Sequence, residues 1–277
     1  MTATDHGGAR DAGTGAVVVL DVSERIATIT LNRPDARNAL SSEVLSLLPI
    51  LMRQADASDD VDVIVLTGAD PAFCAGLDLK ELGSTGGNIR AADQRAGGAD
   101  ARPSASGARG PFPAVTKPLI GAINGVAITG GFELALNCDF LVASERAKFG
   151  DTHARVGVMP GWGLTVLLPQ AIGVRRAREM SFTGNFLSAD EAFQLGLVNH
   201  VVSHVDLIPF TRSLAHDIVG NDQAGVRQIK KTYAEITRDQ PGWDIEARDS
   251  IEWRRTMFSP DKVAERRDGI MSRGRDQ

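Results

Sequence analysis

The sequence predicts an α/β fold in which strands and helices alternate first and helices dominate afterwards. Up to Ala143, short apolar runs rich in β-branched residues alternate with segments of helical pattern. Beyond Ala143 the pattern becomes increasingly helical. The 277 residues are enough to bury a sizeable core, so we expect one main domain with an appendage.

The first elements are predicted from turn and capping residues. Residues 17–20 and 26–31 are apolar runs on either side of Ser23 and Glu24, which is typical of a β-hairpin. Ser41 or Ser42 is expected to cap a helix that runs to about residue 55. Buried strands are predicted at 63–67 and 119–123, and later helices at 174–182, 189–195, 205–219, 223–237, 243–257 and 260–271.

The chain divides into three predicted parts. Residues 1–15 are polar and glycine-rich and are expected to form a disordered leader, residues 16–200 a core domain, and residues 201–277 a helical region. The stretch 83–113 is rich in Gly, Ala, Ser and Arg and has little apolar periodicity. It is either a mobile lid or a surface insertion.

Composition excludes several classes of function. The formal charge of −5 gives no support for nucleic-acid binding, and no segment is long and apolar enough to span a membrane. The five histidines are scattered without metal-ligand spacing, so no metal is expected. Cys74 and Cys138 lie in apolar surroundings, and their number argues against a disulfide framework. The amino end lacks the charged-then-apolar pattern of a signal peptide, so a cytoplasmic, reduced setting is the default expectation.

The most informative segment is the glycine-rich turn before a short apolar helix. The predicted strand 119–123 leads through Asn124 to Gly130 and Gly131, and Glu133 follows in the first helical turn. Glycines at a helix start let the backbone approach a ligand, and the free N–H groups there bind negative charge. A carboxylate one turn further in is able to move a proton. The pattern indicates a reaction that forms an oxyanion.

A second turn has the same character. The predicted strand 63–67 is followed by the segment FCAGLDL at 73–79, in which Gly76 precedes a predicted helix at 78–82. One N–H group from each turn would form a two-point cradle for a carbonyl oxygen. Either turn alone is also typical of an ordinary strand-to-helix connection.

Together these segments resemble the enoyl-CoA hydratase/isomerase (crotonase) family. The resemblance covers roughly residues 17–270, in order and with family-like spacing. Its segments are NRPDARNAL at 32–40, FCAGLDL at 73–79, KPLIGAING at 117–125, GGFELA at 130–135, CD at 138–139, FG at 149–150, GVMPG at 157–161, LSADEA at 187–192 and GLV at 196–198.

The resemblance implies a crotonase-like spiral of strand-strand-helix repeats with a helical carboxy-terminal region. It implies an acyl-CoA thioester as substrate, with the N–H groups of Leu77 and Gly130 as the oxyanion hole and no separate cofactor, since coenzyme A is part of the substrate. It also implies that residues 201–277 are an oligomerisation region and that the protein is a homotrimer or homohexamer. The further residues that it places at the substrate or CoA are Arg37, Ala39, Ala75, Gly76, Asp78, Leu79, Lys80, Gly131, Trp162 and Phe258, the last from an adjacent subunit.

The sequence departs from the family at one catalytic position. Hydratases of this type use two glutamates twenty residues apart; Glu133 matches the first, and His153 stands where the second is expected. Histidine exchanges protons near neutral pH. His153 is therefore the acid–base partner of Glu133, a lining or substrate-binding residue, or a sign that hydratase chemistry is lost. Asp151 either orients the imidazole or is a solvated aspartate, and Trp162 either shapes the acyl pocket or packs in the core.

The resulting hypothesis is a 2-enoyl-CoA hydratase, with Glu133 acting on the water and His153 on the proton at C2. One alternative is an enoyl-CoA isomerase, which moves the double bond without water. Another is a catalytically silent acyl-CoA-binding subunit that keeps the fold and the cradle.

Overall fold

The computed structural model describes residues 15–89, 112–237 and 239–275. A six-stranded sheet in the order β1-β2-β3-β5-β7-β10 runs through the molecule. Apart from the antiparallel β1–β2 hairpin, its strands are parallel. Its strands are β1 (Val18–Ser23), β2 (Ile26–Leu31), β3 (Val63–Gly68), β5 (Leu119–Ile123), β7 (Phe140–Ser144) and β10 (His200–Val202).

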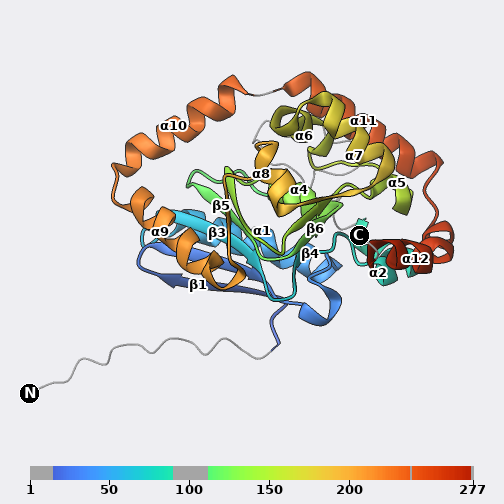
Figure 1. Ribbon diagram of the computed structural model, residues 1–277, viewed down its shortest axis with the longest axis horizontal. Helices are drawn as coiled ribbons and strands as arrows, with labels where there is room; N and C mark the ends of the chain where they lie inside the picture. The colour runs from blue at the N-terminus through green and yellow to red at the C-terminus, as the bar shows by residue number, and fades with distance from the viewer. Residues whose placement is uncertain (1–14, 90–111, 238, 276–277) are drawn as a thin grey trace, which may run out of the picture.

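A second sheet of four short strands lies beside the first, in the order β4-β6-β8-β9. Its strands are β4 (Ala72–Cys74), β6 (Val126–Ile128), β8 (Lys148–Gly150) and β9 (Phe186–Ser188). The chain visits the large sheet, then the small sheet, and then forms a helix, three times in succession: β3-β4-α2, β5-β6-α4 and β7-β8-α5. This is the strand-strand-helix spiral that the family resemblance implies (Figure 1). Because β4, β6 and β8 are parallel neighbours, the turns that follow them leave the small sheet at the same edge.

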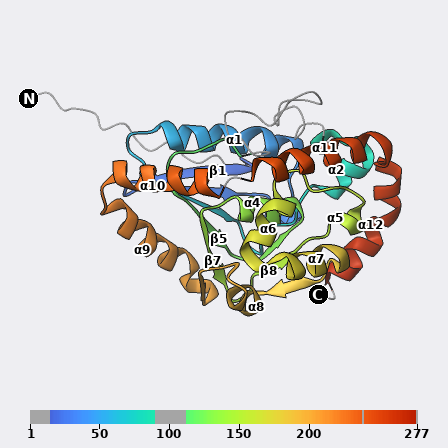
Figure 2. The same ribbon diagram turned by 90° about the horizontal axis from the view of Figure 1, so that it is seen from above.

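Helices cover both faces of the large sheet, as Figure 2 shows for α1 and α9. In β3, Ile64 and Leu66 join the main core under α1, whereas Val63 and Val65 join the core under α9. A strand buried on both faces reads as a continuous apolar run, which is why this strand is recognisable from sequence. The helices are α1 (Ser42–Ala57), α2 (Leu79–Ser84), α4 (Gly130–Leu136), α5 (His153–Val156), α6 (Leu164–Ile172), α7 (Val174–Thr183), α8 (Ala189–Gln194), α9 (Leu207–Val219), α10 (Gln223–Ile236), α11 (Gln240–Thr256) and α12 (Pro260–Arg275), with 3-10 turns at Pro34–Ala36 and His204–Asp206.

The last two helices turn back over the side that carries the turns. In Figure 1, α11 runs along α6, and α12 lies against α2. Leu82 of α2, Val156 of α5 and Val263 of α12 share a small apolar cluster. The carboxy-terminal helices therefore close over the same chain's own strand-to-helix turns.

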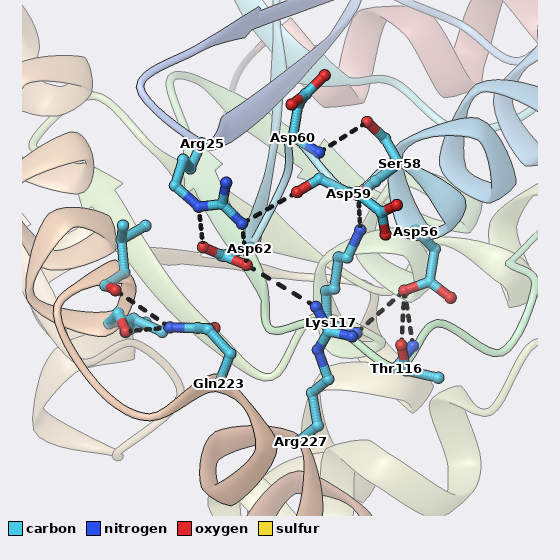
Figure 3. Close-up of polar contacts among 12 residues, drawn as sticks. Arg25, Asp56, Ser58, Asp59, Asp60, Asp62, Thr116, Lys117, Gln223 and Arg227 are labelled. Carbon is cyan, nitrogen blue, oxygen red and sulfur yellow. Dashed lines mark hydrogen bonds and ion pairs between the residues drawn. The ribbon is translucent and has the colours of Figure 1, made fainter.

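A network of charged groups holds α10 to the end of the sheet (Figure 3). Asp62 is buried, forms a two-pronged ion pair with Arg25, and lies 3.8 Å from Arg227 of α10. Lys117 is also buried and donates to the Ala55 carbonyl at the end of α1, 2.9 Å away. Burial lowers the pKa of Lys117.

Most elements agree with the sequence-based predictions. The hairpin forms, and Ser41 caps α1 by accepting from the Val44 N–H. The six predicted later helices are present within a few residues of their expected ends, whereas α5, α6 and the short strands of the small sheet were not predicted. The leader at 1–15 falls almost entirely outside the described residues, as does most of the predicted lid or insertion at 83–113. The three-part division of the chain stays a prediction.

In the part of the chain that the structure describes, no helix could cross a membrane. No group of metal-ligating side chains is found among the same residues. Both cysteines are free thiols, Cys74 fully buried and Cys138 partly so.

Candidate active site

Two of the glycine-containing turns lie against each other. Strands β4 and β6 are parallel neighbours, so the turns that follow them leave the sheet at the same edge. Gly76 has a φ of +81°, and a Cβ on it would lie 2.9 Å from the Ile128 oxygen and 3.0 Å from the Thr129 Cβ. Only glycine fits this conformation and this close approach. The segments that carry Leu77 and Gly130 are thus in contact.

The Leu77 N–H points away from the segment that carries Leu40. Leu40 bridges to this turn by donating to the Gly76 oxygen and accepting from the Asp78 N–H, at 2.8 and 3.1 Å. In such a parallel bridge, the N–H of the middle residue faces the opposite side. Gly130 opens α4, so its N–H has no acceptor in the helix. Among the described residues, neither N–H donates a main-chain hydrogen bond.

Glu133 is held with one oxygen occupied and the other directed at His153. It is only 2 % exposed. Its Oε1 accepts from the N–H groups of Gly161 and Trp162, at 3.2 and 2.7 Å. Its Oε2 lies 3.4 Å from His153 Nε2. The main chain after α5 therefore fixes the carboxylate, and its second oxygen faces His153.

His153 lies between two carboxylates. Opposite its contact with Glu133, its Nδ1 lies 2.7 Å from Asp151 Oδ1, and the same Asp151 oxygen accepts from the His153 main-chain N–H at 3.1 Å. Asp151 is 2 % exposed, so the solvated-aspartate interpretation is wrong. Asp151 lies two residues before His153, where α5 begins. Asp151 orients the imidazole through a tight turn.

The charges of these three groups are coupled. Burial acts to lower the pKa of His153, but the Glu133 and Asp151 carboxylates outweigh it and raise this pKa to about 10. For Asp151, the hydrogen bond and charge of His153 outweigh burial and lower the pKa. His153 therefore keeps its proton near neutral pH.

Trp162 contributes both its ring and its main-chain N–H to the site. Its indole is buried in the main core and packs on Gly130, where a Cβ would lie 2.8 Å from the ring. Its main-chain N–H binds Glu133. The two interpretations made from sequence, a pocket-shaping residue and a core residue, are compatible with this position, because the ring contacts both the core and the start of α4.

A buried carboxylate that sequence reasoning missed lies behind this loop. Glu246 of α11 is 5 % exposed and accepts from the N–H groups of Gly163 and Thr165, at 2.6 and 2.7 Å, and from the Thr165 hydroxyl. Burial and the charge of Glu133 raise its pKa. In the sequence it resembles any charge on an amphipathic helix, so no local signal marks it.

The residues predicted at CoA surround the Gly76 turn. Asp78 caps α2 and pairs with Arg33 at 2.9 Å, a partner that the sequence analysis quoted but gave no role. Phe258 lies near Gly86 and joins the apolar cluster beside Leu77 of its own chain. Of the others, Ala39, Gly76, Gly131 and Trp162 are buried, Ala75 and Leu79 half-buried, and Arg37 and Lys80 exposed. Their contacts with CoA, and the approach of Phe258 to an adjacent subunit, stay predictions.

Comparison with known proteins identifies the family. The model of the enoyl-CoA hydratase/isomerase family matches residues 21–268, so this chain belongs to that family, and its two-sheet spiral with carboxy-terminal helices is the crotonase fold. A crystal structure of enoyl-CoA hydratase from Mycobacterium smegmatis is 47% identical, with a TM-score of 0.76 over 88% of this chain and 100% of that one.

Two curated relatives illustrate the range of names in the family. "Probable enoyl-CoA hydratase 1, peroxisomal" from Arabidopsis thaliana is 42% identical over 206 residues, which cover 74% of this chain and 73% of that protein. The (E)-benzylidenesuccinyl-CoA hydratase of Thauera aromatica is 37% identical over 225 residues, covering 81% and 84%.

Proposed function

We propose that this protein is an enoyl-CoA hydratase that adds water across the double bond of a 2-enoyl-CoA thioester. Its relatives at 35–47% identity carry hydratase names. The observation that supports the chemistry most directly is the buried pair of Glu133 and His153, 3.4 Å apart beside the two glycine turns. Two acid–base groups suit hydration better than double-bond isomerisation, which needs one.

The thioester oxygen would be bound by the N–H groups of Leu77 and Gly130. During addition of water, negative charge builds on this oxygen as the enolate forms. Two preformed donors stabilise that charge, and loss of one such donor costs about 3–4 kcal/mol of barrier. The fixed turn at Gly76 supports this role, because donors that need no reorganisation stabilise charge best.

Glu133 and His153 would move the two protons. The Glu133 carboxylate takes a proton from water while the water oxygen forms its bond to C3, and the electrons of the C2–C3 double bond pass to the thioester oxygen. The His153 imidazolium then gives a proton to C2 as the enolate collapses. Glu133 returns its proton to His153 directly, and the site is ready for another turnover.

An assay with crotonyl-CoA tests the proposal through loss of the conjugated thioester absorbance. Glu133→Gln is expected to abolish turnover and to leave acyl-CoA binding nearly intact, because the amide keeps the shape but cannot accept the proton. Retained activity would remove Glu133 from the mechanism. With a 3-enoyl-CoA, a gain of absorbance would favour the isomerase, and binding without turnover of either substrate would favour the silent subunit.

We also propose a homotrimer or homohexamer in which α10 takes part. Ile229, Tyr233 and Ile236 are spaced along one side of α10 and are 58%, 67% and 76% exposed. An apolar stripe of this kind marks a contact surface. The free thiols agree with a cytoplasmic, reducing setting. Light scattering of the purified protein and cell fractionation test these two statements.

A further inference from the structure

We propose that Glu246 is a positioning residue that fixes the position of the catalytic Glu133 carboxylate through residues 161–165, a loop that ends in the first turn of α6 and is here called the loop. The inference rests on the proposed function, since it takes Glu133 to be the base. Glu246 does not touch Glu133 or the reacting atoms in the proposed mechanism. It acts on the main chain that binds Glu133.

The loop is held from two sides. On one side, Glu133 of α4 binds the N–H groups of Gly161 and Trp162, and Asn137, which directly follows α4, donates from its side chain to the Trp162 carbonyl at 2.8 Å. On the other side, Glu246 binds the N–H groups of Gly163 and Thr165. Four main-chain N–H groups in five residues are thus shared between two carboxylates, so the position of one carboxylate depends on the other.

Helix α11 presents Glu246 within a wider contact. A Cβ on Gly163 would lie 1.9 Å from the ring of Trp243, and one on Gly161 would lie 2.9 Å from the Ser250 hydroxyl. Trp253 donates from its indole to the Gly157 carbonyl at 2.9 Å. Trp243, Glu246 and Ser250 of α11 therefore face residues 161–165, and Glu246 is the charged contact among them. Apolar packing alone would hold the loop near α11 but would not fix the direction of its N–H groups.

Burial makes this contact costly to disturb. Glu246 accepts three hydrogen bonds with two oxygens, and its side chain is enclosed. Glutamine has one acceptor oxygen and one NH₂ group, and this NH₂ group would face the main-chain N–H of either Gly163 or Thr165. Glu246→Gln therefore leaves one of the two main-chain N–H groups unmatched, and the loop must shift to relieve it.

The test compares Glu246→Gln with Glu252→Gln, the same change on the same helix at an exposed position where Glu252 pairs with Arg255. We expect Glu246→Gln to lower kcat for crotonyl-CoA roughly 10- to 100-fold, as about 1 Å of displacement of a catalytic group does, with KM within about twofold. Glu252→Gln should match the wild type. Equal kcat in the two variants would overturn the inference.

A second variant separates positioning from simple loss of structure. Thr165→Val deletes only the hydroxyl contact with Glu246. This variant tests the inference even if Glu246→Gln does not fold, and it should lower kcat with KM unchanged. Unchanged kcat there also overturns it.

Activity of the wild type and of Glu133→Gln distinguishes failure of the Glu246 inference from failure of the proposed hydratase function. If wild-type protein hydrates crotonyl-CoA and both Glu246→Gln and Thr165→Val keep full kcat, the inference alone fails. If Glu133→Gln retains activity, Glu133 is not the base, and the proposed function and this inference fail together.

Discussion

At the scale of single residues, the charge of His153 decides how the proposed reaction depends on pH. The carboxylates of Glu133 and Asp151 raise its pKa to about 10, so the imidazolium that would protonate C2 persists well above neutrality. We expect kcat for crotonyl-CoA to hold to about pH 9 and to fall above about pH 10. A histidine with the ordinary pKa of about 6.5 would lose the proton far earlier.

The measurement is kcat between pH 6 and pH 10.5, with Asp151→Asn as the matched variant. Removing one of the two carboxylates should bring the basic limb toward neutrality, because the imidazolium loses a partner. A limb near pH 7 in the wild type would contradict the assigned charge state.

His153→Ala should lower kcat about 100-fold or more, which is the usual rate contribution of a general acid. Full activity would leave His153 without a role in proton transfer.

The same residue links stability to pH. His153 binds its proton more tightly in the folded chain than in the unfolded one, where its pKa is about 6.5. The stabilisation is therefore complete below about pH 6.5 and is lost as pH rises through about 10. We expect the Tm difference between wild type and His153→Gln to be largest near pH 6 and to shrink toward pH 10. A Tm difference that stays the same from pH 6 to pH 10 would contradict the assigned charge of His153.

At the scale of elements, the start of α4 depends on contact with the neighbouring turn. A Cβ on Gly131 would lie 2.2 Å from the Cys74 main-chain oxygen, which is closer than atoms approach, so α4 would have to move away from β4. Gly131→Ala should lower Tm and also reduce kcat, because Gly130 and Glu133 belong to the same helix.

Thermal unfolding and the crotonyl-CoA assay together measure this effect. Gly220→Ala is the matched control, because Gly220 has an ordinary right-handed conformation and a Cβ there would meet nothing closer than 3.5 Å. It should retain Tm and activity. A Gly131→Ala protein with unchanged Tm and kcat would show that the two turns are not fixed against each other.

At the scale of the whole molecule, α10 is anchored by charge and leaves an apolar side exposed. Lys230 reaches back to Asp139 at 2.7 Å, and Arg227 faces Asp62, so the polar side of the helix is attached to the sheet. Tyr233→Glu should weaken assembly of subunits, since it places a charge on the exposed apolar stripe, and should leave the fold of each chain intact.

Light scattering over a dilution series measures the assembly, and circular dichroism checks the fold. Lys231→Gln, on the same helix at an exposed charged position, is expected to leave the assembly unchanged. A wild-type protein that is monomeric at all concentrations would refute the proposal for α10.

Much of this arrangement could be predicted from local sequence. Long buried strands and amphipathic helices follow from their periodicity, and the paired turns follow from Gly76, Gly130 and Gly131. The short strands of the small sheet could not be predicted, because three residues carry too little periodicity and their pairing is set by distant segments. Helix α6 was missed because Pro169 and a mostly apolar composition hide its pattern.

The sequence by itself determined the fold class, the two turns and the identity of the acid–base candidates Glu133 and His153, because each of these depends on residue type and on spacing along the chain. Only the tertiary structure decided the charge of His153, the burial of Asp151 and the contact of Glu246 with the loop. These depend on which carboxylates are brought within a few ångströms of one another and removed from water. That is a property of packing between α4, α5 and α11, which no local pattern encodes.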